Sequence, residues 1–115
     1  MGVAISIIAI ALTLAFSTLL WLLSARYAPR FAGRERVVMN WSFTGEPNSY
    51  ASPRVALSAT PATGTATLLL IGGLVAFATP RSERAVATLM IVLAGVALIA
   101  VHAAHMHFAA KSPDR

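Results

Sequence analysis

Three histidines near the end of the chain are the side chains best suited to chemistry: His102, His105 and His107. His102 and His105 are three residues apart, so on a helix they share a face. Two imidazoles placed this way are candidate ligands for a metal ion or a haem. A pH-sensing role is also open, because imidazole side chains in general titrate near neutrality. A complete site needs further ligands, and no carboxylate lies nearby in the sequence. The alternative is that the histidines lie at the boundary between lipid and water with their polar tips in water. We therefore expect no cofactor.

Carboxylates are too few and too scattered for acid–base catalysis. The chain has four acidic residues, Glu35, Glu46, Glu83 and Asp114, and none lies in an apolar run. No phosphate-binding loop, nucleophile motif or paired carboxylate is present. No ionisable group lies in the middle of an apolar run, which argues against a pump or transporter that acts alone. We expect no catalytic residue and a protein that is not an enzyme.

The composition indicates a membrane protein. Of the 115 residues, 57% are hydrophobic and 11% are charged, whereas soluble domains are about 25% charged. The net charge is +5, and the basic residues flank apolar runs, where they set topology and contact anionic headgroups. We expect the lipid bilayer to be a partner and nucleic acid not to be one. The absence of cysteine excludes a disulfide framework.

Three apolar runs are long enough to cross the bilayer, which takes about 20 helical residues. The fold predicted is therefore an all-α membrane protein with three transmembrane helices, forming a single domain over residues 1–115. We expect helices at about 3–25, 59–79 and 84–108, with a long ordered loop at 26–58. The connection Pro80-Arg81-Ser82-Glu83-Arg84 is short, so the second and third helices should form a tight antiparallel hairpin. The expected location is the bacterial inner membrane, with several passes.

Small residues recur four apart on these runs, a spacing that lets helix backbones approach closely in lipid. An alanine-rich chain can also produce such pairs by chance. Gly72-Gly73 is more informative, because glycine costs about 1 kcal/mol in a helix relative to alanine. We expect Gly72, Gly73 and Ala76 to mark a tight crossing or a bend, within this bundle or against a partner. The other small pairs are Ala9, Thr13 and Ser17; Ala11 and Ala15; Ala100 and Ala104.

The loop at 26–58 carries the most specific pattern. Val37, Met39, Trp41 and Phe43 alternate with less apolar residues, which predicts an extended segment with one apolar face. Gly45 breaks the alternation. The run Glu46-Pro47-Asn48-Ser49 suits a tight turn. Ser52-Pro53 is typical of a helix N-cap followed by proline, so the second helix should begin near Pro53 and kink at Pro61.

Residues 39–54 resemble the loop of a small bacterial membrane domain of unknown function, which also occurs at the N-terminus of SdpI-type immunity proteins. The residues that match are Trp41, Gly45, Pro47, Tyr50 and Ser52, with Asn48 as a conservative match. Asn40 stands where the family commonly has histidine, Ser42 replaces an asparagine, and Pro53-Arg54 replaces the closing lysine. The resemblance covers about the first 80 residues and implies a membrane protein without catalytic activity, with an immunity-like or signalling-like role. The loop motif comprises Asn40, Trp41, Gly45, Glu46, Pro47, Asn48, Tyr50, Ser52 and Arg54.

Two orientations and three functions follow from these observations. The arginines after the first run place the loop in the cytoplasm by the positive-inside rule, whereas the resemblance implies a loop outside. The leading hypothesis is that the loop recognises a peptide, a lipid or a protein. The alternatives are an accessory subunit of a larger membrane complex and a metal- or haem-binding membrane subunit. We expect another membrane protein, or further copies of this chain, as a partner.

Overall fold

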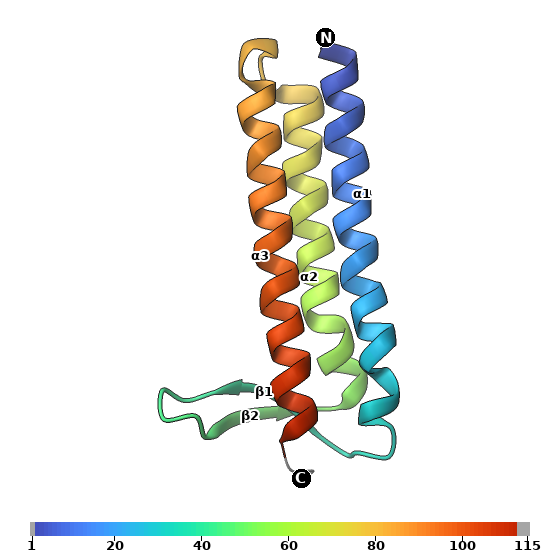
Figure 1. Cartoon of the computed structure of the whole chain (residues 1–115), viewed down its shortest axis with the longest axis vertical. Coiled ribbons are helices and arrows are strands. Elements are labelled where there is room, and N and C mark those ends of the chain that lie inside the picture. The colour runs from blue at the N-terminus through green and yellow to red at the C-terminus, as the bar shows by residue number, and fades with distance from the viewer. Residues whose placement is uncertain (1, 113–115) are drawn as a thin grey trace.

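The computed structural model describes residues 2–112, which form three long helices and one short β-hairpin (Figure 1). The first helix, α1, spans Gly2–Tyr27, because its apolar sequence has neither proline nor glycine after its first residue. Pro29 follows α1 within a short 3-10 turn, η1, at Ala28–Phe31. The turn redirects the chain, since the residue before a proline is disfavoured in an α-helix.

The second helix, α2, spans Pro53–Gly73, so it begins before the apolar run. The hydroxyl of Ser52 accepts a hydrogen bond from the backbone N–H of Val55 at 3.3 Å, as the Ser-Pro pair predicted. Pro61 lies inside α2 and is buried. A π-helical turn, η2, continues the helix over Leu74–Ala78.

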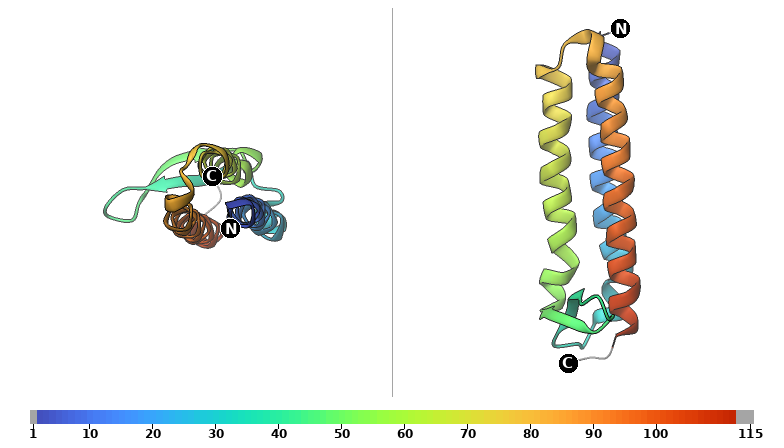
Figure 2. Two further views of the ribbon diagram at one scale, coloured as in Figure 1. Left: turned by 90° about the horizontal axis from the view of Figure 1, so that it is seen from above. Right: turned by 90° about the vertical axis from the view of Figure 1, so that its left-hand side faces the viewer.

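The third helix, α3, spans Arg84–Lys111 and follows a 3-10 turn, η3, at Arg81–Glu83. The short connection makes α2 and α3 antiparallel, as predicted, and α1 runs parallel to α3 (Figures 1 and 2). The bundle measures 52 × 28 × 16 Å. Its three helical segments, Val3–Phe31, Pro53–Ala78 and Arg81–Lys111, are each long and apolar enough to cross a membrane.

Glycines allow the helices to approach closely at three levels. A Cβ atom on Gly72 would collide with the Thr13 side chain of α1, and one on Gly95 would collide with the Phe16 ring. A Cβ atom on Gly64 would lie 2.8 Å from Leu20. The contacts at Gly72 and Gly95 leave no room for a side chain, so these two glycines fix where α2 and α3 meet α1. The atom nearest Gly64 is the movable end of the Leu20 side chain.

The small residues singled out in the sequence do not all pack within this bundle. Gly72 and Ala76 are buried, but nothing lies within 4 Å of a Cβ atom placed on Gly73. Successive helical residues are about 100° apart, so only one of two adjacent glycines can face the same neighbour. On α1 the packed face is Ala9, Thr13 and Ser17. The other predicted pairs are exposed: Ala11 and Ala15; Ala100 and Ala104.

The loop holds a two-stranded antiparallel sheet, with β1 at Val37–Trp41 and β2 at Pro47–Ala51. Irregularities in the register lie around Asn40. The hairpin leaves the bundle sideways, roughly across the helix axes (Figures 1 and 2). Its root therefore lies against the helices and its tip stands clear of them.

Two details of the loop prediction are wrong. The turn lies at 42–45 rather than 46–49: the Ser42 N–H donates to the Glu46 carbonyl at 2.8 Å, and Gly45 has a φ of +85°. A positive φ suits glycine, so Gly45 sets the turn and Pro47 begins β2. The prediction of a single apolar face is also wrong. Val37 and Val38 are both buried at the root of the hairpin, and Phe43 at its tip is fully exposed.

Candidate functional site

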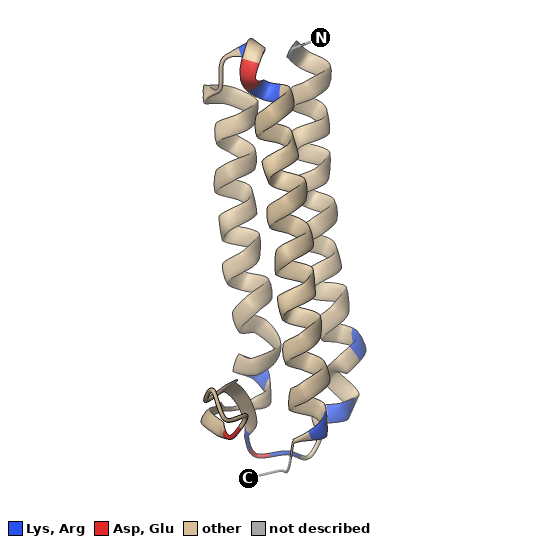
Figure 3. Ribbon diagram, turned by 60° about the vertical axis from the view of Figure 1, so that its left-hand side comes forward, with Lys and Arg blue, Asp and Glu red and all other residues tan. Residues whose placement is uncertain are grey.

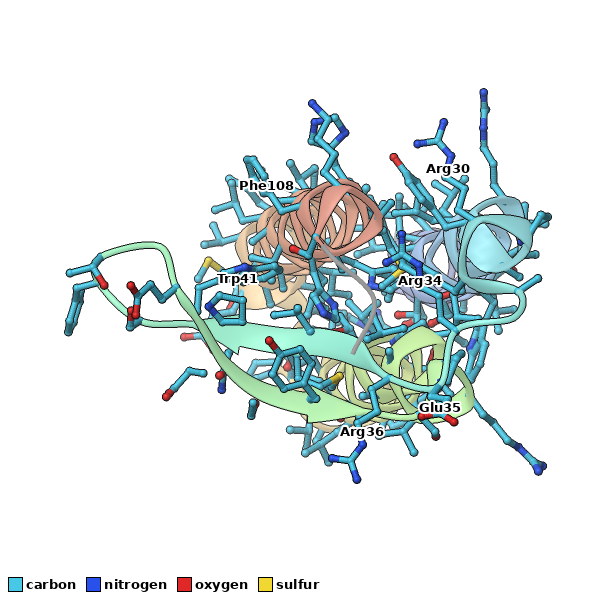
Figure 4. All side chains as sticks on the ribbon, turned by 90° about the horizontal axis from the view of Figure 1, so that it is seen from below. Arg30, Arg34, Glu35, Arg36, Trp41 and Phe108 are labelled. Atoms are coloured by element: carbon cyan, nitrogen blue, oxygen red, sulfur yellow. The ribbon has the colours of Figure 1, made fainter. Side chains whose placement is uncertain are left out.

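Trp41 connects the β-hairpin to α3 through two aromatic contacts. Its ring centroid lies 5.9 Å from that of His105 and 6.4 Å from that of Phe108, and both pairs meet edge to face. Edge-to-face pairs of this kind contribute about 0.5–1.5 kcal/mol beyond burial alone. The ring is therefore held by the last turns of α3, and Figure 4 shows Trp41 and Phe108 on the same side of the bundle.

His105 also fixes the backbone of β1. Its Nε2 atom lies 2.8 Å from the carbonyl oxygen of Val38. A carbonyl only accepts hydrogen bonds, so Nε2 must carry the proton. The His105 side chain therefore donates a hydrogen bond that holds β1 against α3.

Two hollows lie next to Trp41 and share Trp41 and Phe108 as walls. The end hollow has a volume of about 580 Å³ and lies at the end of the bundle. The side hollow has a volume of about 400 Å³ and lies where β1 meets α2 and α3. The end hollow is lined by Trp41, Gly45, Pro47, Phe108, Lys111 and Ser112. The side hollow is lined by Met39, Asn40, Trp41, Thr60, Val101, Ala104, His105 and Phe108.

Arg34 closes the C-terminal end of α3. Its guanidinium donates to the carbonyl of Ala109 at 3.0 Å, to that of Ala110 at 2.8 Å and to that of Ser112 at 3.2 Å. The last carbonyls of a helix have no partner within the helix and carry its negative dipole end. Arg34 supplies both the hydrogen-bond donors and the positive charge that this helix end lacks. Its guanidinium also lies 5.4 Å from the centre of the buried Phe31 ring.

His102 lies in the interior of the bundle, completely buried. Its Nε2 atom lies 2.7 Å from Oγ of Ser24, whose hydroxyl donates to the carbonyl of Leu57. Because the one hydroxyl proton of Ser24 goes to that carbonyl, His102 must donate from Nε2. Its Nδ1 atom, like Oγ of Ser17, is buried without a hydrogen-bond partner among residues 2–112.

The arrangement of the histidines corrects the interfacial interpretation for His102. A side chain with no exposure does not lie with its polar tip in water. The Nε2 atoms of His102 and His105 bind different partners, Ser24 and Val38, although the two residues share a helix. Within the described part of the chain, no group of three His, Cys, Asp or Glu side chains could hold a metal ion.

The residues of the loop motif fall into three groups. Trp41, Gly45 and Pro47 line the end hollow, and Asn40 lines the side hollow. Tyr50 pairs with Val38 across the sheet, and Ser52 caps α2. The remaining members, Glu46, Asn48 and Arg54, are exposed and line neither hollow.

Charged side chains gather at the two ends of the bundle (Figure 3). Within residues 2–112 the hairpin end has six basic residues and two acidic residues. The opposite end has two basic residues and one acidic residue. The basic residues of the hairpin end are Arg26, Arg30, Arg34, Arg36, Arg54 and Lys111, and its acidic residues are Glu35 and Glu46. This end therefore favours anionic surroundings.

Sequence reasoning missed four residues of this end: Ser24, Arg34, Phe108 and Lys111. Phe108 and Lys111 are three apart in the last turns of a predicted helix, so their common face was readable. Arg34 and Ser24 gave no local signal, because their partners are 75 to 78 residues away in the sequence. No family model matches the chain, and neither a curated protein nor a solved structure is similar to it.

Proposed function

We propose that this chain is a non-catalytic integral membrane protein of the bacterial inner membrane that recognises a partner through its hairpin end. The three helical segments cross the bilayer, and the charged ends lie at its two surfaces. The length and apolar character of the segments support this placement. By the positive-inside rule the basic hairpin end faces the cytoplasm.

The observation that carries the proposal is the position of Trp41. Its ring is held between β1 and α3, contacts His105 and Phe108, and forms a wall of both hollows. Aromatic side chains fixed in this way are typical anchors of recognition surfaces. The resemblance of residues 39–54 to the loop of the SdpI-type membrane domain agrees with a recognition role, and an immunity-like or signalling-like function remains part of the proposal by analogy.

The test is photo-crosslinking in intact cells, with a photoreactive amino acid at position 43. Phe43 is fully exposed at the hairpin tip, so the probe disturbs no packing. We expect a discrete crosslinked product that is lost when Trp41→Ala, Gly45→Val or Tyr50→Ala is added, while the amount of protein in the membrane stays the same. A probe at position 93 on the exposed face of α3 is the matched control.

The same experiment distinguishes recognition by the hairpin from the alternative of an accessory subunit. The observation that favours the alternative is the exposure of two small-residue pairs, on α1 and α3: Ala11 with Ala15, and Ala100 with Ala104. A subunit that packs its helices against a larger complex gives products from position 93 and not from position 43. Products from neither position would refute recognition of a protein or peptide by the hairpin end.

A further inference from the structure

The exposed face of α3 changes from apolar to cationic toward the hairpin end. Val101, Ala104, Phe108 and Lys111 are spaced three or four apart and therefore lie on one face. Val101 is 62% exposed and Phe108 57% exposed, so this face is open to its surroundings. In lipid such a face offers an acyl chain an apolar track that ends at an ammonium group.

The two hollows lie at different positions along this face of α3. Val101 and Ala104 line the side hollow, while Lys111 lines the end hollow. Seven to ten residues separate these positions, which is about 10–15 Å along a helix that rises 1.5 Å per residue. With the membrane placement proposed above, the side hollow therefore lies nearer the centre of the bilayer, and the end hollow lies nearer the headgroups.

We propose that the two hollows together bind one anionic phospholipid. Its phosphate lies beside Lys111 in the end hollow, and the upper part of one acyl chain lies against Val101 and Ala104 in the side hollow, passing the exposed edge of Phe108. This inference rests on the proposed membrane insertion and names one ligand of the hairpin end.

Charge complementarity selects an anionic lipid over a zwitterionic one. Among residues 2–112, the hairpin end has six basic residues against two acidic ones, and Lys111 lines the end hollow. A lysine near the headgroups favours an anionic lipid by a factor of about five. The walls formed by Trp41 and Phe108 are apolar. A phospholipid can fill both hollows with its phosphate and its acyl chain, whereas a free anion can fill only the end hollow.

The test uses quenching of Trp41 fluorescence by lipids brominated on the upper acyl chain. Trp21→Phe leaves Trp41 as the single tryptophan of the full chain, reconstituted in vesicles. We expect brominated phosphatidylglycerol to quench Trp41 about fivefold more effectively than brominated phosphatidylcholine at equal mole fraction. The reciprocal variant, Trp41→Phe, leaves Trp21 on the exposed face of α1 and reports insertion.

Two substitutions remove the proposed contacts, and each has a matched control. Lys111→Gln should abolish the preference for phosphatidylglycerol, whereas Arg36→Gln, the same charge change at an exposed position outside both hollows, should retain it. Ala104→Phe should fill the side hollow and reduce quenching by both lipids. Ala25→Phe, on the exposed face of α1 near the same end, should not.

Three results would overturn the inference: equal quenching by the two lipids, no quenching of Trp41, or an equal loss of preference in Arg36→Gln and Lys111→Gln. Quenching of Trp21 without a lipid preference at Trp41 rejects the lipid site and leaves the proposed function standing. No quenching at either tryptophan rejects the membrane insertion itself.

Discussion

Ser24 on α1 and His102 on α3 meet at 2.7 Å in the interior of the bundle, 78 residues apart in the sequence. The same serine hydroxyl donates to the Leu57 carbonyl on α2. One small side chain therefore links all three helices near the hairpin end.

Removing that hydroxyl should destabilise the bundle. Ser24→Ala leaves His102 Nε2 and the Leu57 carbonyl without this partner, and we expect a loss of about 1–3 kcal/mol in the free energy of unfolding, measured in detergent micelles. Thr18→Ala is the control, because Thr18 is exposed and bonds only to the Leu14 carbonyl of its own helix. In the double variant Ser24→Ala/His102→Leu the loss should be smaller than the sum of the single losses. Additive losses would show that the two residues are not coupled.

Arg34 should hold the last turn of α3. Arg34→Gln removes the charge and most of the donors, so we expect faster hydrogen exchange at residues 106–112 and a loss of about 1–2 kcal/mol in stability. Arg34→Lys should be only slightly better, because an ammonium group does not reproduce the planar fork that reaches three carbonyls. Arg36→Gln provides the comparison at an exposed neighbour. Unchanged exchange in Arg34→Gln would show that the helix end does not depend on this arginine.

Two adjacent glycines should respond to alanine with opposite signs. Gly72→Ala places a methyl group against Thr13, including its Cβ atom at 3.2 Å, and should cost about 1–3 kcal/mol. Gly73→Ala meets open space and should stabilise the helix by up to about 1 kcal/mol. Adding Thr13→Ala to Gly72→Ala should recover part of the loss. Thermal unfolding in the same detergent measures all three, and equal effects at the two glycines would contradict this helix packing.

The orientation of the chain can be measured directly because the chain lacks cysteine. Asn48→Cys on β2 and Ser82→Cys in η3 are both exposed and lie at opposite ends of the bundle. With the hairpin end in the cytoplasm, a maleimide that does not cross the inner membrane should label position 82 in intact cells, and position 48 only after the membrane is permeabilised. The reverse pattern would favour the orientation that the SdpI resemblance implies.

The sequence predicted the helices well, because each helix depends on local properties. Apolar length marked α1 and α3, and the Ser52-Pro53 pair marked the start of α2. The strand β1 was also visible as an alternating pattern, yet its limits were not. Phe43 continues that pattern, but the hairpin has left the bundle at that point and no partner buries the ring.

The contacts that form the candidate site join residues that are far apart in the sequence, and no local sequence pattern predicts such contacts. Trp41 was singled out, but its partners His105 and Phe108 lie more than 60 residues later. Gly95 was missed because it stands alone, without a small neighbour four residues away, and its role appears only with Phe16 against it. Of two neighbouring glycines, only the geometry of the crossing decides which one is needed.

The bonds from Arg34 to the end of α3 bear on the order in which the chain is made. Arg34 leaves the ribosome about 75 residues before the carbonyls that it caps, and the Val38 carbonyl must await His105. Until synthesis of α3 is complete, residues 28–51 have neither contact. The contacts that hold residues 28–51 against α3 therefore form only after the whole of α3 has been made.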